Sequence, residues 1–169
     1  LKAPEDTPGS CALLIQILLA AGLPGSVLSL VYGVPSDISE YLIPHRTIRK
    51  VSFTGSTVVG KHLAAMAGRH MKRVTLELGG HGPAMVFADA DRDHAVKMIA
   101  TSKYRNAGQI CVSPTRIMVH ESHYDGFVEG FVSAAEAIKV GDGMDGSTAM
   151  GPVVSQRRLD AISSLIRDA

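Results

Sequence analysis

The stretch KVSFTGSTVVGKHLAAMAGRHMKRVTLEL, residues 50 to 78, decides the fold class of this 169-residue chain. It begins with a short strand pattern, KVSF, and ends with a second one, RVTLEL. Between them, the residues from Ser56 or Thr57 to about Gly68 have a helical pattern. A helix that connects two strands is the repeating unit of α/β proteins, and such strands usually lie parallel in one sheet. We therefore expect an α/β fold with a mainly parallel sheet.

The alternation of strands and helices continues on both sides of this stretch. Further strands are predicted at residues 27–31, 83–87 and 115–120, and further helices at residues 8–21, 36–43, 89–108, 124–138 and 159–169. Residues 141–152 form a glycine-rich loop. Gly79 and Gly80 interrupt the pattern after RVTLEL. They are the predicted boundary between two domains, residues 1–79 and residues 80–169.

Composition excludes several classes of protein. Hydrophobic residues make up 46% of the chain and the net charge is +1, which argues against a disordered chain and against a nucleic-acid-binding surface. The longest apolar run, residues 11–22, is too short to span a membrane. With only two cysteines, we expect a reducing compartment and a cytoplasmic location. The start at LKAPEDTP and the helical pattern at the end suggest an interior part of a longer protein.

Two segments resemble known motifs without completing them. GSTVVGKH, residues 55–62, follows a strand and is close to a phosphate-binding P-loop, but His62 stands where that motif needs Ser or Thr. The segment remains either an anion site at a helix N-terminus or an ordinary turn. HESH, residues 120–123, lacks the HExxH spacing of zinc enzymes. We expect no metal site.

LELGG, residues 76–80, places Glu77 between two leucines at the end of a predicted strand. A carboxylate in apolar surroundings is costly to keep charged and is suited to act as a general base. The alternative is a strand glutamate that faces solvent, because Thr75, Glu77 and Gly79 share one face. The alternation by itself favours the alternative.

YRNAGQICVSPTR, residues 104–116, places Cys111 in a polar loop. A single cysteine is most often a small buried apolar residue. A thiol in a polar loop beside backbone donors ionises more readily and can serve as a nucleophile. From the loop alone, both readings of Cys111 remain open.

Taken together, these segments resemble the aldehyde dehydrogenase family. The resemblance is carried, in order, by KAPEDTP (2–8), FTGST (53–57), VTLELGG (74–80), DAD (89–91), NAGQIC (106–111), KVGDG (139–143) and MGP (150–152). It implies that residues 1–79 are part of a Rossmann-type NAD(P)-binding domain. Residues 80–169 are then the first part of an α/β catalytic domain.

The resemblance also implies a catalytic mechanism. Cys111 takes the place of the family's nucleophile, which attacks the aldehyde and forms first a thiohemiacetal and then a thioester. Glu77 takes the place of the general base that activates the water for hydrolysis. Both roles go against the more ordinary readings given above. The family's oxyanion asparagine would precede residue 1, and its nicotinamide-ribose glutamate would follow residue 169, so the isolated chain is expected to be inactive.

The cofactor residues follow from the same resemblance. Lys2 and Glu5 match the residues that hold the adenosine ribose hydroxyls, and Gly55 and Ser56 match the turn at the pyrophosphate. Because a carboxylate at Glu5 would repel a 2′-phosphate, we expect NAD rather than NADP. The full-length protein is expected to be a homodimer or a homotetramer that acts on a small-molecule aldehyde.

SKYRNAGQIC is similar to the succinate-semialdehyde dehydrogenase subgroup, where an arginine six residues before the nucleophile binds the substrate carboxylate. Arg105 stands at that position, which favours a semialdehyde such as succinic semialdehyde. Alternatively, Arg105 is a cation at a helix C-terminus. Two other functions remain as hypotheses: a cofactor-independent thiol hydrolase or esterase that uses Cys111 and Glu77, and a non-catalytic structural relative.

Overall fold

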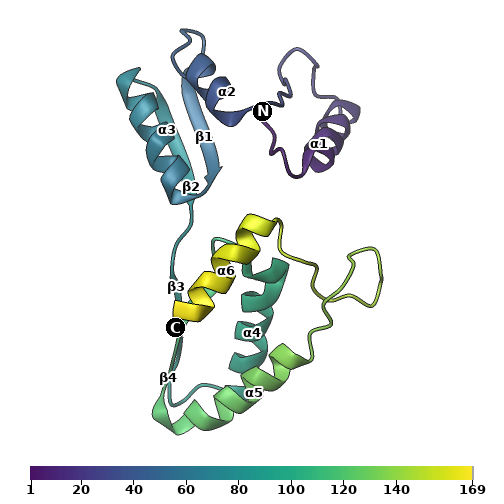
Figure 1. The fold of residues 1–169 in the computed structure, drawn as a ribbon, viewed down its shortest axis with the longest axis vertical. Coiled ribbons are helices and arrows are strands. Elements are labelled where there is room, and N and C mark those ends of the chain that lie inside the picture. Colours follow the sequence, from purple (N-terminus) through teal and green to yellow (C-terminus); the bar gives the residue numbers. More distant parts are fainter. Residues whose placement is uncertain (169) are drawn as a thin grey trace. The chain divides into compact units, whose positions relative to one another are not determined.

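The computed structural model describes residues 1–168, which fold into two compact units. The first unit is Leu1–Glu77 and the second begins at Leu78. Figure 1 shows the elements of both units in sequence colours. None of the helices within residues 1–168 is both long and apolar enough to cross a membrane.

The first unit contains three helices and a two-stranded sheet. In chain order these are α1 (Pro8–Ala20), α2 (Pro35–Leu42), β1 (Lys50–Gly55), α3 (Thr57–Arg69) and β2 (Arg73–Leu78), and β1 pairs with β2. The predicted strand–helix–strand order of residues 50–78 is thereby confirmed. α3 buries Leu63, Met66 and Ala67 with Ile43, and Val51 and Phe53 of β1 pack against this cluster. The core of the unit therefore lies between α3 and β1.

The strand predicted at residues 27–31 is wrong. This segment forms only an isolated parallel bridge between Val31 and Lys2. The Ala3 N–H donates to the Val31 carbonyl at 3.0 Å, and the Val31 N–H donates to the Leu1 carbonyl at 2.9 Å. Gly33, the next residue that would donate in this ladder, has a φ of 142° and so leaves the extended conformation of a strand. The pairing therefore stops before a regular strand can form.

The strand β2 is mostly exposed. Arg73, Val74 and Thr75 are all exposed, and Glu77 is exposed at its end. The alternating pattern predicted the strand and the exposed face of Glu77 correctly, but Val74 on the apolar face is exposed as well. Residues of β1 pack against the buried cluster of this unit and residues of β2 do not, so β2 has little apolar cover within the described chain.

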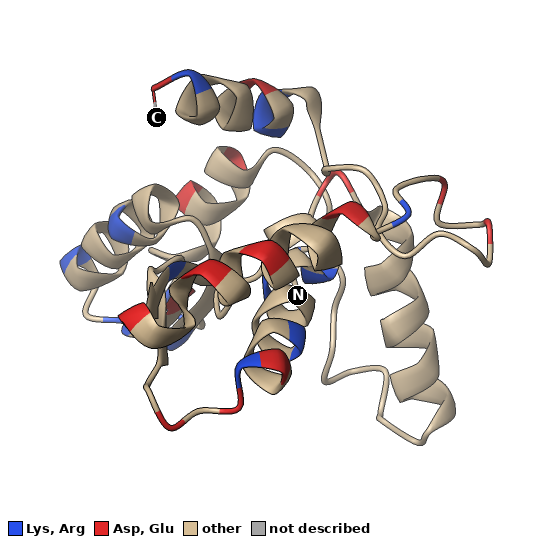
Figure 2. Cartoon of the chain, turned by 90° about the horizontal axis from the view of Figure 1, so that it is seen from below, with Lys and Arg blue, Asp and Glu red and all other residues tan. Residues whose placement is uncertain are grey.

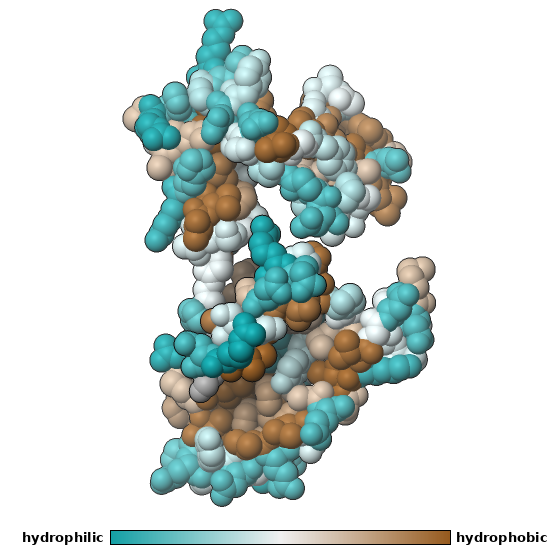
Figure 3. Space-filling view, in the orientation of Figure 1, coloured by the Kyte–Doolittle hydropathy of each residue, from teal (hydrophilic) through white to brown (hydrophobic). Residues whose placement is uncertain are grey.

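Helix α1 carries no charged residue and buries none of its side chains. In Figure 2 the whole helix is tan, the colour of residues other than Lys, Arg, Asp and Glu, and Figure 3 shows apolar side chains gathered over it. Leu13 and Ile17 are each more than half exposed. A helix that is apolar on all sides normally lies in a protein interior. This helix therefore presents an unusually apolar surface in the described chain.

The second unit packs helices against a parallel pair of strands. Its elements are β3 (Gly82–Val86), α4 (Arg92–Tyr104), the turn η1 (Arg105–Gly108), β4 (Pro114–Val119), η2 (Glu121–His123), α5 (Tyr124–Glu136) and α6 (Gln156–Asp168). β3 and β4 are parallel, with Met85 opposite Met118 and Val86 opposite Val119. The expected parallel pairing is confirmed for these two strands.

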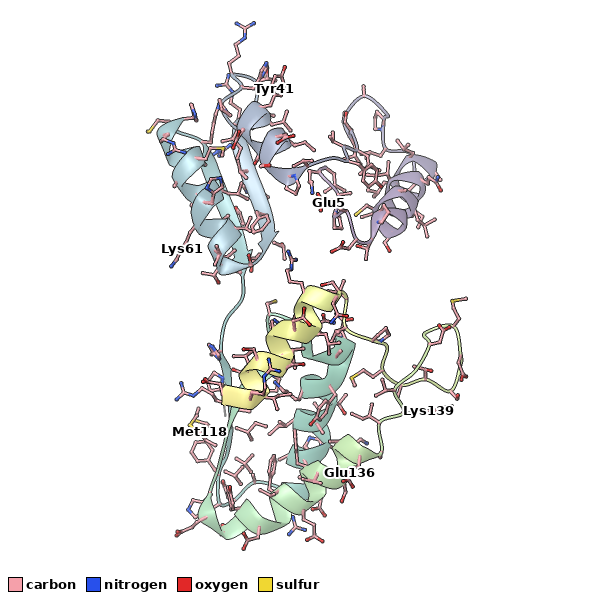
Figure 4. All side chains as sticks on the ribbon, in the orientation of Figure 1. Glu5, Tyr41, Lys61, Met118, Glu136 and Lys139 are labelled. Carbon is pink, nitrogen blue, oxygen red and sulfur yellow. The ribbon has the colours of Figure 1, made fainter. Side chains whose placement is uncertain are left out.

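One face of this strand pair is covered and the other is not. Val86, Val96 of α4 and Phe127 of α5 form the buried cluster. On the other face, Met85 and Met118 are 59% and 45% exposed, and Figure 4 shows Met118 pointing away from α4 and α5. Parallel strands are usually covered on both faces. The outer face of β3 and β4 is thus a second apolar surface.

The helix predicted over residues 89–108 is shorter than expected. α4 begins after Asp91, whose carboxylate accepts the His94 N–H at 3.0 Å, and it ends at Tyr104. Asn106 and Ala107 have φ values of 52° and 54°, so the chain turns in the left-handed sense. A right-handed helix cannot continue through such residues. The other predicted helices and strands agree with the structure to within about three residues.

Candidate active site

Cys111 lies in an exposed loop that begins with a left-handed turn. Asn106, Ala107 and Gly108 have consecutive positive φ values of 52°, 54° and 72°. Glycine and asparagine adopt this conformation at low cost, whereas alanine adopts it only at a cost in backbone energy. Cys111 and Val112 are exposed at the end of the loop. The buried-packing reading of Cys111 does not apply to the described chain.

Ser113 fixes the end of this loop against α4. It is the one buried polar residue in the described chain, 4% exposed. Its hydroxyl donates to the Lys103 carbonyl at 3.2 Å, and its N–H donates to the Ile110 carbonyl at 3.0 Å. The loop therefore leaves α4 near Lys103 and returns to it only two residues after Cys111.

Gln109 makes a cluster of hydrogen bonds that the sequence motifs did not indicate. Its side-chain nitrogen donates to the Asn106 carbonyl at 3.1 Å, and the Asn106 side chain donates to the Gln109 carbonyl at 3.4 Å. Its side-chain oxygen accepts the Val154 N–H at 3.3 Å. Asn106 and Gly108, on either side of Ala107, are residue types that favour a left-handed turn. Nothing in the sequence indicated the partner 45 residues away.

Glu77 lies at the exposed end of β2, the last residue of the first unit. The solvent-facing alternative therefore describes its environment within this chain. Cys111 belongs to the second unit. A carboxylate in an accessible position can reach a water molecule, which is what a general base requires.

Lys2 and Glu5 lie together. The Lys2 ammonium donates a hydrogen bond to the Glu5 carboxylate and forms an ion pair with it. This hydrogen bond is the main cause that lowers the pKa of Glu5, and it is helped by the Glu5 backbone. The pair presents a cation and an acceptor oxygen side by side near Glu5, which is labelled in Figure 4. Such a pair can bind two neighbouring hydroxyl groups.

Gly55 and Ser56 form the turn between β1 and α3. Ser56 is the N-cap of α3, and its side chain accepts the Val59 N–H at 3.3 Å. A Cβ at position 55 would collide with the Phe53 ring, which would have to move to make room for it. The first N–H groups of a helix lack partners within it and attract anions. The P-loop-like segment thus forms a turn that can approach a phosphate.

Arg105 ends α4, with φ and ψ values of −54° and 129°. It is exposed, and it forms no ion pair with a carboxylate of residues 1–168. It lines a cavity of about 380 Å³ together with Tyr104, Ile138 and Met150, among others. Cys111 is not among the lining residues. Within residues 1–168, no cluster of three or more His, Cys, Asp or Glu side chains could hold a metal ion.

A sequence model of the aldehyde dehydrogenase family matches residues 1–169. The putative 4-(hydroxymethyl)benzenesulfonate dehydrogenase TsaD2 of Comamonas testosteroni is 49% identical over 166 residues, which cover 98% of this chain and 35% of that protein. This chain spans about a third of the length of the curated relatives it matches.

Solved structures agree with this similarity. Succinate-semialdehyde dehydrogenase from Burkholderia pseudomallei superposes with a TM-score of 0.94 at 42% identity, over 99% of this chain and 35% of that one. An NADP-dependent enzyme of E. coli gives a TM-score of 0.95 at 38% identity, over 100% of this chain and 35% of that one. The expected fold class is confirmed by these superpositions.

Proposed function

On the premise that this chain belongs to the aldehyde dehydrogenase family, we propose that the whole protein oxidises an aldehyde to a carboxylic acid with a nicotinamide cofactor. Cys111 is the proposed nucleophile and Glu77 the proposed general base. The observation that carries the proposal is the exposed thiol of Cys111, held on a loop whose left-handed turn is fixed by hydrogen bonds at both ends. Relatives named as dehydrogenases of aldehydes support it.

The proposed reaction uses this chain's residues in two stages. In the first, the Cys111 thiol loses its proton to water, and the thiolate sulfur bonds to the aldehyde carbon. The aldehyde oxygen becomes an oxyanion, which neighbouring N–H groups can stabilise. A bound nicotinamide would supply the hydride acceptor that this carbon needs, and Cys111 would then hold the acyl group as a thioester. In the second stage, Glu77 takes a proton from water, the resulting hydroxide adds to the thioester carbon, and the thiolate leaves with release of the acid.

The described residues fit a dinucleotide. The turn at Gly55 and Ser56 offers helix N–H groups to a pyrophosphate. Lys2 and Glu5 offer a cation and an acceptor to the ribose hydroxyls. We propose NAD as the preferred cofactor, because the Glu5 carboxylate would repel a 2′-phosphate. One similar structure is named as NADP-dependent, and equal kcat/KM values with NAD and NADP would contradict the proposed preference.

A semialdehyde is the proposed substrate class. Arg105 is free of ion pairs with carboxylates of residues 1–168, so its guanidinium is available to a distal carboxylate of the substrate. The similarity to a succinate-semialdehyde dehydrogenase supports this assignment. For the whole protein we further propose a cytoplasmic homodimer or homotetramer.

One assay tests the proposed reaction, substrate class and cofactor together. The full-length protein is incubated with succinic semialdehyde or an uncharged aldehyde of similar length, with NAD or NADP, and cofactor reduction is followed. We expect the highest kcat/KM with the semialdehyde and NAD, and no oxidation by Cys111→Ala, which should keep its affinity for NAD within a few-fold. Ester cleavage without cofactor reduction would instead favour the thiol hydrolase. Inactivity in both assays would favour a non-catalytic relative.

A further inference from the structure

The loop that carries Cys111 is joined to a distant segment by one side chain. The carboxamide of Gln109 uses both of its ends: its oxygen accepts the Val154 N–H, and its nitrogen donates to the Asn106 carbonyl. Val154 lies just before α6, in the segment that follows the glycine-rich loop. Gln109 thus connects the left-handed turn to a part of the chain 45 residues further on.

The turn needs such support. Three consecutive residues in the left-handed conformation are rare when they are not all glycine. The Ala107 side chain has no polar group that could offset the cost of this conformation. The Gln109 N–H also donates to the Asn106 carbonyl, at 3.1 Å. Asn106 and Gln109 are therefore joined by three hydrogen bonds across the turn. These bonds offset the strain, and Gln109 lies only two residues before Cys111.

We infer that Gln109 is a positioning residue for Cys111, an inference that rests on the proposed function. It fixes the left-handed turn to the Val154 segment and so sets where the Cys111 sulfur stands. Ser113 fixes the loop on its other side through Lys103. A thiol that must meet an aldehyde carbon in the correct orientation gains rate from such fixation. Gln109 itself does not touch the reacting atoms in this scheme.

The test is Gln109→Met in the full-length protein, because methionine keeps the approximate volume and removes both side-chain hydrogen bonds. Two neutral hydrogen bonds of ordinary strength correspond to about a tenfold effect. We expect kcat for aldehyde oxidation to fall about tenfold while KM for NAD stays within about twofold. Amide hydrogen exchange of residues 106–113 and of Val154 should become about tenfold faster.

Gln156→Met is the matched control. Gln156 is exposed and donates to the Asp160 carboxylate at 2.8 Å within α6, so the same chemical change there should leave kcat and loop exchange unaltered. If Gln109→Met fails to fold, Gln109→Glu replaces it: glutamate keeps an oxygen for Val154 and loses the donor to Asn106, and an intermediate loss of kcat is expected. Hydrogen exchange of the Val154 amide is also measured in the wild-type protein, so this part of the test does not depend on whether a variant folds.

The outcomes separate the two claims. An active wild-type protein whose Gln109→Met variant has normal kcat and normal exchange overturns the positioning role alone. A wild-type Val154 amide that exchanges as fast as a free loop amide also overturns it. Failure of the wild-type protein to oxidise any aldehyde counts against the proposed function instead.

Discussion

At the residue scale, Cys111 and Glu77 differ in how far their surroundings in this chain support the proposed catalytic roles. Cys111 is exposed on a loop that hydrogen bonds fix at both ends. Glu77 is exposed on a strand with little cover. A nucleophile depends on local geometry, whereas a general base needs only access to water and to the bond that breaks. The two residues therefore call for different kinetic tests.

Glu77→Gln should separate the two stages of the reaction. Glutamine keeps the size of the side chain but cannot accept a proton from water, so the thioester forms and then accumulates. A burst of about one reduced cofactor per active site is expected, followed by slow turnover. Rapid mixing with NAD and aldehyde measures it. A uniformly slow trace without a burst would place the role of Glu77 before hydride transfer.

Arg105→Leu should decide the substrate class. If Arg105 binds a distal carboxylate, its removal leaves that carboxylate unpaired. The fall in kcat/KM for succinic semialdehyde should then correspond to a loss of about 2–4 kcal/mol of transition-state stabilisation. For an uncharged aldehyde of similar length the change should be small. Using both substrates on one variant separates recognition from damage to the nearby loop. Equal losses would make Arg105 a structural helix-end cation.

At the element scale, the end of α4 and the turn after it determine how the Cys111 loop is presented. α4 stops at Tyr104 because Asn106, Ala107 and Gly108 take positive φ values. The loop then returns to α4 through Ser113. A tight left-handed turn thus stands where α4 would otherwise continue. The direction in which the Cys111 loop leaves α4 therefore depends on backbone conformation more than on side-chain packing.

Gly108→Ala should destabilise this turn. Gly108 has a φ of 72°, and an added Cβ would lie 3.2 Å from the Lys103 carbonyl oxygen. A residue with a Cβ in this conformation costs about 1–2 kcal/mol. Gly143→Ala is the control, since its Cβ would meet nothing within 4 Å. Urea unfolding of both variants, followed by circular dichroism, measures the difference; equal free energies of unfolding would contradict the strain argument.

The sequence predicted most elements because their patterns are local. The strand–helix–strand order of residues 50–78 and the helix at Pro8 follow from apolar spacing and from proline at a first helical position. The strand predicted at residues 27–31 does not form because a strand needs a partner, and within residues 1–168 this segment pairs only through the bridge between Val31 and Lys2. The Gln109–Val154 contact spans 45 residues, and no local pattern encodes it. The resemblance to family motifs predicted Cys111 and Glu77 as catalytic candidates. Their exposure and hydrogen-bond partners depend on tertiary packing, which the motifs do not describe.

At the scale of the whole molecule, both units expose apolar surface. In the first unit, α1 exposes Leu13 and Ile17. In the second, the outer face of β3 and β4 exposes Met85 and Met118, and Phe87, the residue after β3, is exposed as well. Apolar patches on one surface usually mark a contact with other protein. The curated relatives are about three times as long as this chain.

This contrast predicts how the isolated 169-residue chain differs from the full-length protein. If further residues cover α1 and the outer face of β3 and β4, the isolated chain should bind a hydrophobic dye such as anilinonaphthalene sulfonate strongly, and the full-length protein weakly. The isolated chain should also reduce no cofactor, since a catalytic site works only when all its groups are held in place. Dye fluorescence and cofactor reduction are measured on both proteins at equal concentration. Turnover by the isolated chain at a rate near that of the full-length protein would show that residues 1–169 hold the complete catalytic machinery, and the expected inactivity would be wrong.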